Sequence, residues 1–175
     1  LALEGPLSKN KKTNFLFSAR QSYLQFLFAA IGLPFLPTYN DFQFKVKSSL
    51  KNNDEFYITG LGAIDRFKLN LDAKETPEQR YILNNIHINN QWNYTLGAVY
   101  KKFLKTSYFT FVISRNMLDN EIYKHTDNNE NLPKSIDYNS QESENKFRAE
   151  HTLRFGNKYK LNYGIGYEYV RFYRY

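Results

Sequence analysis

The sequence contains no cysteine, so disulfide bonds and cysteine-based metal or redox sites are excluded. Long apolar runs are absent as well. The longest uncharged and mostly apolar run extends from Phe26 to Leu36 and is interrupted by Gly32 and Pro34. It has about half of the roughly 20 residues that a transmembrane helix needs. We therefore do not expect this chain to cross a membrane as a helix.

Residue patterns typical of catalysis or metal binding are also lacking. Histidine occurs 3 times, and the three positions have neither i,i+4 pairing nor a neighbouring carboxylate motif. No spacing around Ser114 is typical of a hydrolase. We expect no catalytic residues, no metal site, no cofactor and no enzymatic activity. The three histidines are His87, His125 and His151.

The chain is basic and rich in aromatic residues. Lys and Arg number 24 against 17 Asp and Glu, which gives a net charge of +7. These basic residues are scattered and no nucleic-acid-binding motif accompanies them, so we expect no nucleic-acid partner. Phe and Tyr number 15 each, and aromatic residues make up 18% of the chain. A chain this rich in aromatic residues can bury enough surface to order itself, which argues against intrinsic disorder.

The dominant pattern is alternation of apolar and polar residues with a period of two, which is typical of β-strands. In one example Phe42, Phe44 and Val46 alternate with polar neighbours. The segment 55–66 is ambiguous because Gly60 and Gly62 blur its two faces. The sequence predicts eight strands, near residues 1–7, 13–21, 39–50, 54–67, 88–104, 107–124, 144–156 and 158–175.

The links between these predicted strands alternate in length. The short ones are 8–12, 51–53, 105–106 and Asn157, and the long ones are 22–38, 68–87 and 125–143. Residues 21–31 have apolar positions near helical spacing. A second helix is predicted to begin at Thr76, with Pro77 at its first position and Gln79 at its third. The polar, Asn-rich link 125–143 is predicted to be a mobile loop.

Three features favour a membrane barrel over a soluble sandwich. Several predicted strands are far longer than the 5 or 6 residues usual in globular proteins. Short and long links alternate as do the turns and loops of outer-membrane barrels. The aromatic rows fit girdles at the headgroup level. The predicted fold is all-β: an antiparallel transmembrane β-barrel segment of about eight up-and-down strands, with short periplasmic turns and long extracellular loops. Rings such as Phe44, Trp92, Phe111 and Tyr163 should face lipid, and ions such as Lys45 and Arg148 a watery lumen.

Several stretches, taken in order, resemble the barrel region of TonB-dependent outer-membrane receptors, of the type with a carboxypeptidase-regulatory-like domain upstream. The resemblance implies that residues 1–175 are the N-terminal part of a barrel of about 22 strands, without the plug domain and the remaining strands. The matching stretches are Leu3-Glu4-Gly5-Pro6-Leu7, Ser18-Ala19-Arg20-Gln21-Ser22-Tyr23, 33–41, 60–65, Glu78-Gln79-Arg80-Tyr81, Gln91-Trp92-Asn93-Tyr94 and Ser114-Arg115-Asn116.

The resemblance also implies a function. Such receptors take up scarce nutrients actively across the outer membrane of Gram-negative cells. Expected partners are outer-membrane lipid and an unknown small nutrient ligand, with the TonB complex and the plug domain contacted only in the full-length protein. The candidate lumen or rim contacts could instead form an ion-pair network that binds no specific ligand. These candidates are Arg20, Lys45, Lys47, Asp65 and Arg115.

Two other interpretations stay open at this point. The chain could be a complete eight-stranded outer-membrane barrel that serves as an anchor or adhesion module. It could also be a soluble β-sandwich that binds ligands.

The apolar segment from Tyr23 to Leu36 is expected to pack over the barrel rim. Its functional version would be a lid that faces substrate or a partner.

Overall fold

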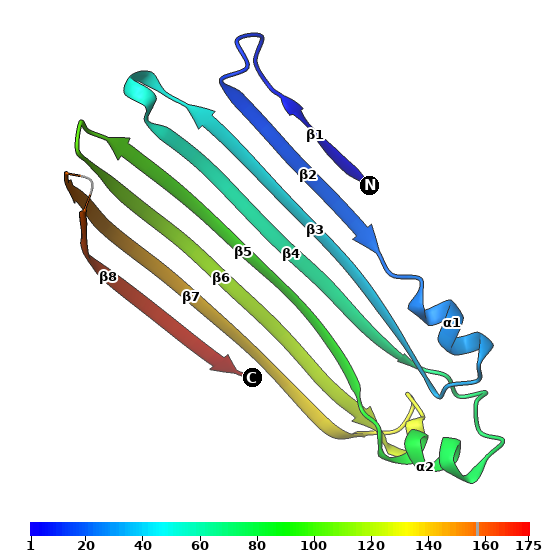
Figure 1. Ribbon diagram of the computed structural model, residues 1–175. Coiled ribbons are helices and arrows are strands. Elements are labelled where there is room, and N and C mark those ends of the chain that lie inside the picture. The colour runs from blue at the N-terminus through cyan, green and yellow to red at the C-terminus, as the bar shows by residue number, and fades with distance from the viewer. Residues whose placement is uncertain (157) are drawn as a thin grey trace.

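The computed structural model describes residues 1–156 and 158–175. In this part of the chain eight strands form one antiparallel sheet in which each strand pairs with the next (Figure 1). The up-and-down order predicted from the sequence is therefore confirmed. The strands are β1 (Ala2–Pro6), β2 (Thr13–Gln21), β3 (Phe35–Ser49), β4 (Glu55–Leu69), β5 (Ile88–Phe103), β6 (Ser107–His125), β7 (Lys134–Phe155) and β8 (Tyr159–Arg174).

The sheet stays open. Within the described residues, β1 pairs only with β2 and β8 only with β7, so the outer edges of both strands have no partner. Figure 1 shows the three long links together at one end of the sheet and the short links at the other. We call these the loop end and the turn end. The short link predicted at Asn157 lies outside the described residues.

The strand bounds differ from the prediction by more than two residues at two places. β3 begins at Phe35 instead of residue 39, and β7 begins at Lys134 instead of residue 144. The predicted mobile loop 125–143 is therefore wrong over most of its length. Residues from Lys134 onward pair with β6, which continues to His125 and supplies hydrogen-bonding partners for their backbone. Apart from Ile136 and Tyr138 this segment is polar on both faces, so it carries little of the alternation from which strands are recognised.

Both predicted helices are present. α1 (Leu24–Ala30) lies in the first long link and α2 (Pro77–Asn85) in the second. Thr76 and Gln79 form a reciprocal capping box at the start of α2, with Pro77 in its first turn, as the sequence predicts. In the described part of the chain, no helix is long and apolar enough to span a membrane. Two short 3-10 turns, η1 (Lys51–Asn53) and η2 (Thr126–Asn128), complete the links.

The strand register places the alternating apolar residues of different strands on one face of the sheet. Residues directly opposite in neighbouring strands share a face. We call this side the apolar face and the other the polar face. Phe44, Trp92, Phe111 and Tyr163 lie on the apolar face by this rule. One continuous row of paired residues crosses β2 to β8: Phe15, Val46, Ile58, Ala98, Ile113, Phe147 and Tyr167.

The register also explains the ambiguous segment 55–66. Gly62 is opposite Phe42, and Gly60 is opposite Phe44. A Cβ on Gly62 would come within 2.5 Å of Cζ of Phe42, and a Cβ on Gly60 would collide with the ring of Phe44. The two glycines thus leave room for rings from β3 to lie across β4. Their lack of a side chain is what blurs the alternation in the sequence.

Nothing among the described residues covers the apolar face. Ile165 is 71% exposed and Trp92 is 45% exposed. The sheet therefore has no packed second layer that could serve as the core of a soluble domain. The most buried apolar side chains of the described residues include Pro34, Ala73, Leu83 and Met117.

Asp54 fixes the turn between β3 and β4 against β5. Its carboxylate accepts hydrogen bonds from the Tyr100 hydroxyl at 2.8 Å and from the Phe103 backbone N–H at 2.9 Å, and the residue is buried. The Phe103 N–H, then the Tyr100 hydroxyl, and to a smaller extent the charge of Lys102 hold the pKa of Asp54 below its usual value. Hydrogen bonds of this kind favour the charged carboxylate.

We expect this anchor to weaken in acid. Because the folded-state pKa of Asp54 is lowered, its contribution to stability is present above the unfolded-state value of about 3.9 and is lost as the pH falls through the folded-state pKa. At pH 6 the Phe103 amide should exchange with solvent several-fold faster in Asp54→Asn than in the wild type. The two rates should converge only as the pH falls through the lowered folded-state pKa of Asp54. Hydrogen-exchange mass spectrometry of the complete protein measures this ratio as the pH is lowered, and a ratio that stays constant while Asp54 becomes protonated would contradict the assignment.

Candidate functional site

Several charged side chains on the polar face form ion pairs, some of which join neighbouring strands. Nε of Arg20 lies 2.9 Å from Oδ1 of Asp41, which joins β2 to β3. Nζ of Lys47 lies 2.6 Å from Oε1 of Glu55, which joins β3 to β4. Such partly exposed pairs contribute little to stability. They do show that this face carries charge without burying it.

The most connected of these groups lies on β7 and β8. Nζ of Lys146 is 2.9 Å from a carboxylate oxygen of Glu144 and 3.6 Å from one of Glu168. Asn116 donates a further hydrogen bond to Glu144 at 2.6 Å, which extends the network to β6. The sequence analysis did not identify this cluster. The signal that could have identified it is the spacing of Glu144 and Lys146, since residues two apart lie on the same strand face.

The structure does not bring the five candidate residues together at one site. Arg20 and Lys47 form the ion pairs described above. Lys45 lies over the Tyr57 ring, with its Nζ 5.0 Å from the centroid, and Asp65 accepts a hydrogen bond from Gln91 at 3.0 Å. These four lie on the polar face, distributed over β2, β3 and β4.

Arg115, the fifth candidate, lies on the apolar face. Its guanidinium donates to the Tyr94 hydroxyl and to Oδ1 of Asn145, both at 2.9 Å. It follows Phe109, Phe111 and Ile113 in the same row, which continues on β6 with Met117 and then becomes polar with Asp119. Arg115 therefore lies near the edge of the apolar area on the side of the loop end.

The three long links are tied to one another at the loop end. Nε2 of Gln79, in α2, donates to the carbonyl of Gly32 in the first link at 2.7 Å. Nζ of Lys124, at the end of β6, donates to the carbonyls of Leu83 at 3.1 Å and Ile86 at 2.8 Å. Asn128, in the third link, donates to Leu83 as well, at 2.9 Å. The carbonyl of Leu83 in the last turn of α2 and that of Ile86 at its C-cap thereby have hydrogen-bond donors.

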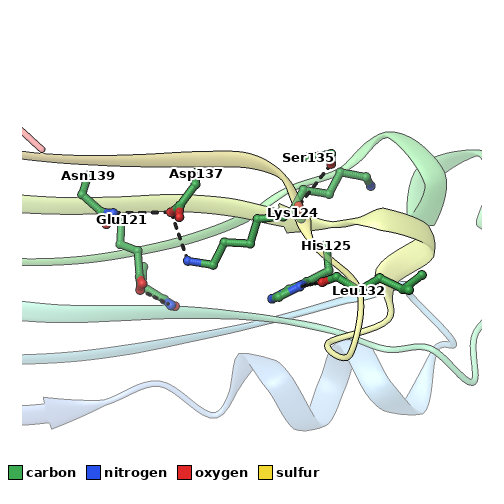
Figure 2. A network of polar contacts seen from close by, with 9 residues as sticks. Glu121, Lys124, His125, Leu132, Ser135, Asp137 and Asn139 are labelled. Atoms are coloured by element: carbon green, nitrogen blue, oxygen red, sulfur yellow. Dashed lines mark hydrogen bonds and ion pairs between the residues drawn. The ribbon is translucent and has the colours of Figure 1, made fainter.

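The third link is braced from within by polar contacts of β6 and β7 (Figure 2). Nδ1 of His125 lies 2.8 Å from the carbonyl oxygen of Leu132, and Ser135 donates to the carbonyl of Lys124 at 3.1 Å. Asp137 accepts from Lys134 at 3.0 Å. These contacts connect the end of β6, the third link and the start of β7.

A cavity of about 320 Å³ lies at the loop end, between the ends of β4 and β6 and the second and third links. Its volume is at the lower limit for a site that holds a small molecule. The wall is mainly apolar with a few charged groups. The residues that line it are Phe67, Lys68, Leu69, Leu71, Ile86, Ile88, Tyr123, Lys124, His125, Asn128 and Glu130.

The three histidines are in separate environments. His125 lies at the loop end, and His151 lies on the apolar face, stacked on Phe109 with ring centroids 3.9 Å apart. In residues 1–156 and 158–175, no group of three or more His, Asp or Glu side chains is arranged to hold a metal ion.

Comparison with the models of known protein families and with curated protein sequences found no match. The fold and its two faces define a class of structure: an antiparallel meander of long strands with one uncovered apolar face and one charged face.

Proposed function

We propose that this chain is part of the β-barrel of an outer-membrane protein, with the apolar face in contact with lipid and the polar face lining a watery interior. The observation that carries the proposal is the bare apolar face on a sheet whose opposite face holds ion pairs. In water, exposure of so large an apolar face would be costly. A bilayer removes that cost, and a hydrated lumen accommodates the charges.

The dimensions of the apolar face support a bilayer. On β8 the apolar row extends from Leu161 to Tyr169, eight steps of about 3.3 Å, or about 26 Å along the strand. A strand tilted by about 40° then covers about 20 Å of depth, close to the outward apolar band of about 25 Å in outer-membrane barrels. From β3 to β8 every strand has between 15 and 22 residues, which is enough to extend beyond the bilayer.

The change of composition along the apolar face supports the same orientation. Trp92, Tyr94 and Tyr169 lie near the edge where the apolar area ends. Polar residues lie among these rings: Asp119 on β6 is directly opposite Trp92, and Arg171 follows Tyr169 on the same face of β8. Rings with one polar atom are typical of the membrane–water interface.

The two open edges favour a barrel with further strands. An unpaired strand edge is not tolerated in lipid, because its N–H and C=O groups have no partner. Closure of these eight strands alone would require β1, with 5 residues, to pair with β8, with 16. Additional strands between the two edges would satisfy both along their full length.

By its resemblance to TonB-dependent receptors, we further propose that the whole protein takes up a small nutrient ligand actively across the outer membrane. This chain would supply part of the polar conduit and three of the extracellular links. Arg20, Lys45, Lys47 and Asp65 would line the interior that the plug domain occupies. The cavity at the loop end would lie where an incoming ligand first meets the barrel.

Cysteine labelling of intact cells tests the topology. The absence of cysteine from this chain means that one introduced thiol is its only target. Asn129→Cys, in the third long link, should react with a membrane-impermeant thiol reagent in cells that display the complete protein. Thr106→Cys, in a short turn, should react only after the outer membrane is permeabilised. The reverse pattern would overturn the orientation, and equal labelling of both would overturn membrane insertion.

A further inference from the structure

The turn end carries a set of exposed lysines that form no salt bridge within the described residues. The two carboxylates nearest to Lys51 in the chain have other partners, because Asp54 accepts hydrogen bonds from Tyr100 and Phe103, and Glu55 is paired with Lys47. We call this set the turn-end lysines: Lys9, Lys11, Lys12, Lys51, Lys102, Lys105 and Lys158.

An exposed apolar residue stands at the start of each of the four short links. These residues are Leu7, Leu50, Leu104 and Phe155, and their exposed fractions lie between 44% and 59%. Leu7, Leu50 and Leu104 donate backbone hydrogen bonds across their turns, to Thr13, Asp54 and Ser107, and Phe155 pairs with Tyr159. The ladder thus continues to these positions, and alternation places all four on the apolar face.

We propose that the turn end lies in the headgroup layer of an anionic leaflet, with each apolar residue at the acyl boundary and the lysines on lipid phosphates. The partner is anionic phospholipid. Two observations favour it over a soluble polyanion: the apolar residues continue the face assigned to lipid, and lysines flank each of them. Long lysine side chains reach from an apolar boundary to the phosphates, and anionic lipid surfaces attract clustered lysines. This inference rests on the proposed membrane barrel.

The test measures lipid selectivity of the complete protein in vesicles of phosphatidylcholine that contain spin-labelled phosphatidylglycerol or spin-labelled phosphatidylcholine. In the wild type we expect the phosphatidylglycerol probe to associate about threefold more strongly at low salt, and the preference to shrink in 0.5 M NaCl as charge is screened. The variant K51Q/K102Q/K105Q should lose most of the preference. The matched control K68Q/K74Q/K134Q removes the same charge from the loop end and should retain it.

A second variant, Leu50→Ser with Leu104→Ser, separates a lipid surface from a soluble polyanion. If this variant also lowers the phosphatidylglycerol preference, the lipid assignment is supported. If it leaves the preference unchanged while K51Q/K102Q/K105Q loses binding to soluble polyphosphate, the lysines serve a polyanion and the inference is overturned. An inserted protein with no preference for either probe also overturns the inference but leaves the proposed barrel intact. Failure to insert into any vesicle overturns both.

Discussion

Substitution of Gly164 by alanine should lower the free energy of unfolding of the complete protein by about 3 kcal/mol, the upper end of the range for overpacking. Gly164 lies on β8 opposite Glu150. A Cβ at this position would collide with the backbone carbonyl oxygen of Ala149 and would come within 3.0 Å of the Cα of Glu150. Both are backbone atoms of the paired strand, so no side-chain rotation relieves the clash. The β7–β8 ladder has to shift instead.

Gly166→Ala is the matched control for this prediction. Gly166 lies on the same face of β8, two residues further along, and its added Cβ would meet the carbonyl oxygen of Phe147 at an ordinary contact distance of 3.7 Å. Alanine there reduces the freedom of the unfolded chain and should stabilise the protein by about 0.5 kcal/mol. Urea titration of both variants in lipid vesicles measures the difference. Equal effects would show that the close approach at Gly164 is not a constraint.

The second large effect concerns the apolar face. Ile113→Lys should lower the free energy of unfolding by about 2 to 4 kcal/mol, because it places an ammonium group in hydrocarbon. Ile113 is 57% exposed and lies between Ala98 and Phe147 in the apolar row. In water, replacement of an exposed isoleucine by lysine would change stability by no more than about 0.5 kcal/mol. The size of the effect therefore reports directly on the solvent at this face.

Leu61→Lys provides the control on the polar face. Leu61 is 50% exposed, and its neighbours across the strands are Gln43 and Thr95. If the polar face lines a watery interior, lysine should be tolerated there within about 0.5 kcal/mol. Unfolding of the two variants in vesicles should differ by at least about 2 kcal/mol. If Ile113→Lys left the free energy of unfolding unchanged while Leu61→Lys lowered it, lipid or protein would have to cover the polar face. That result would contradict the proposed orientation.

The positions of most strands, and the face on which each of their residues lies, could be predicted because the signal for both is local. The alternation of Phe42, Phe44 and Val46 with polar neighbours identifies β3 without knowledge of any other strand. The capping box at Thr76 and Gln79 likewise involves residues three apart, and the structure confirms it. Arg115 shows the strength of this local rule, since the period of two places it on the apolar face, although its charge alone suggested the lumen or the rim.

The extension of β7 was missed because its cause is not local. Apart from Ile136 and Tyr138, residues 134–143 have polar side chains on both faces, and their strand conformation depends on backbone partners supplied by β6. The ties at the loop end have the same character. Gln79 and Gly32 are far apart in the chain, and only folding brings their amide and carbonyl groups within 2.7 Å.

The sequence by itself determined the number of strands, their alternating faces, the order of short and long links and the start of α2, because these depend on neighbouring residues in one segment. Only the tertiary structure decided that the apolar residues of all these strands share one face, that Gly60 and Gly62 accommodate the rings of Phe42 and Phe44, and that charges such as Arg20 and Asp41 on the polar face are paired. These properties depend on register, since a slip of one residue between two strands would move each side chain to the other face.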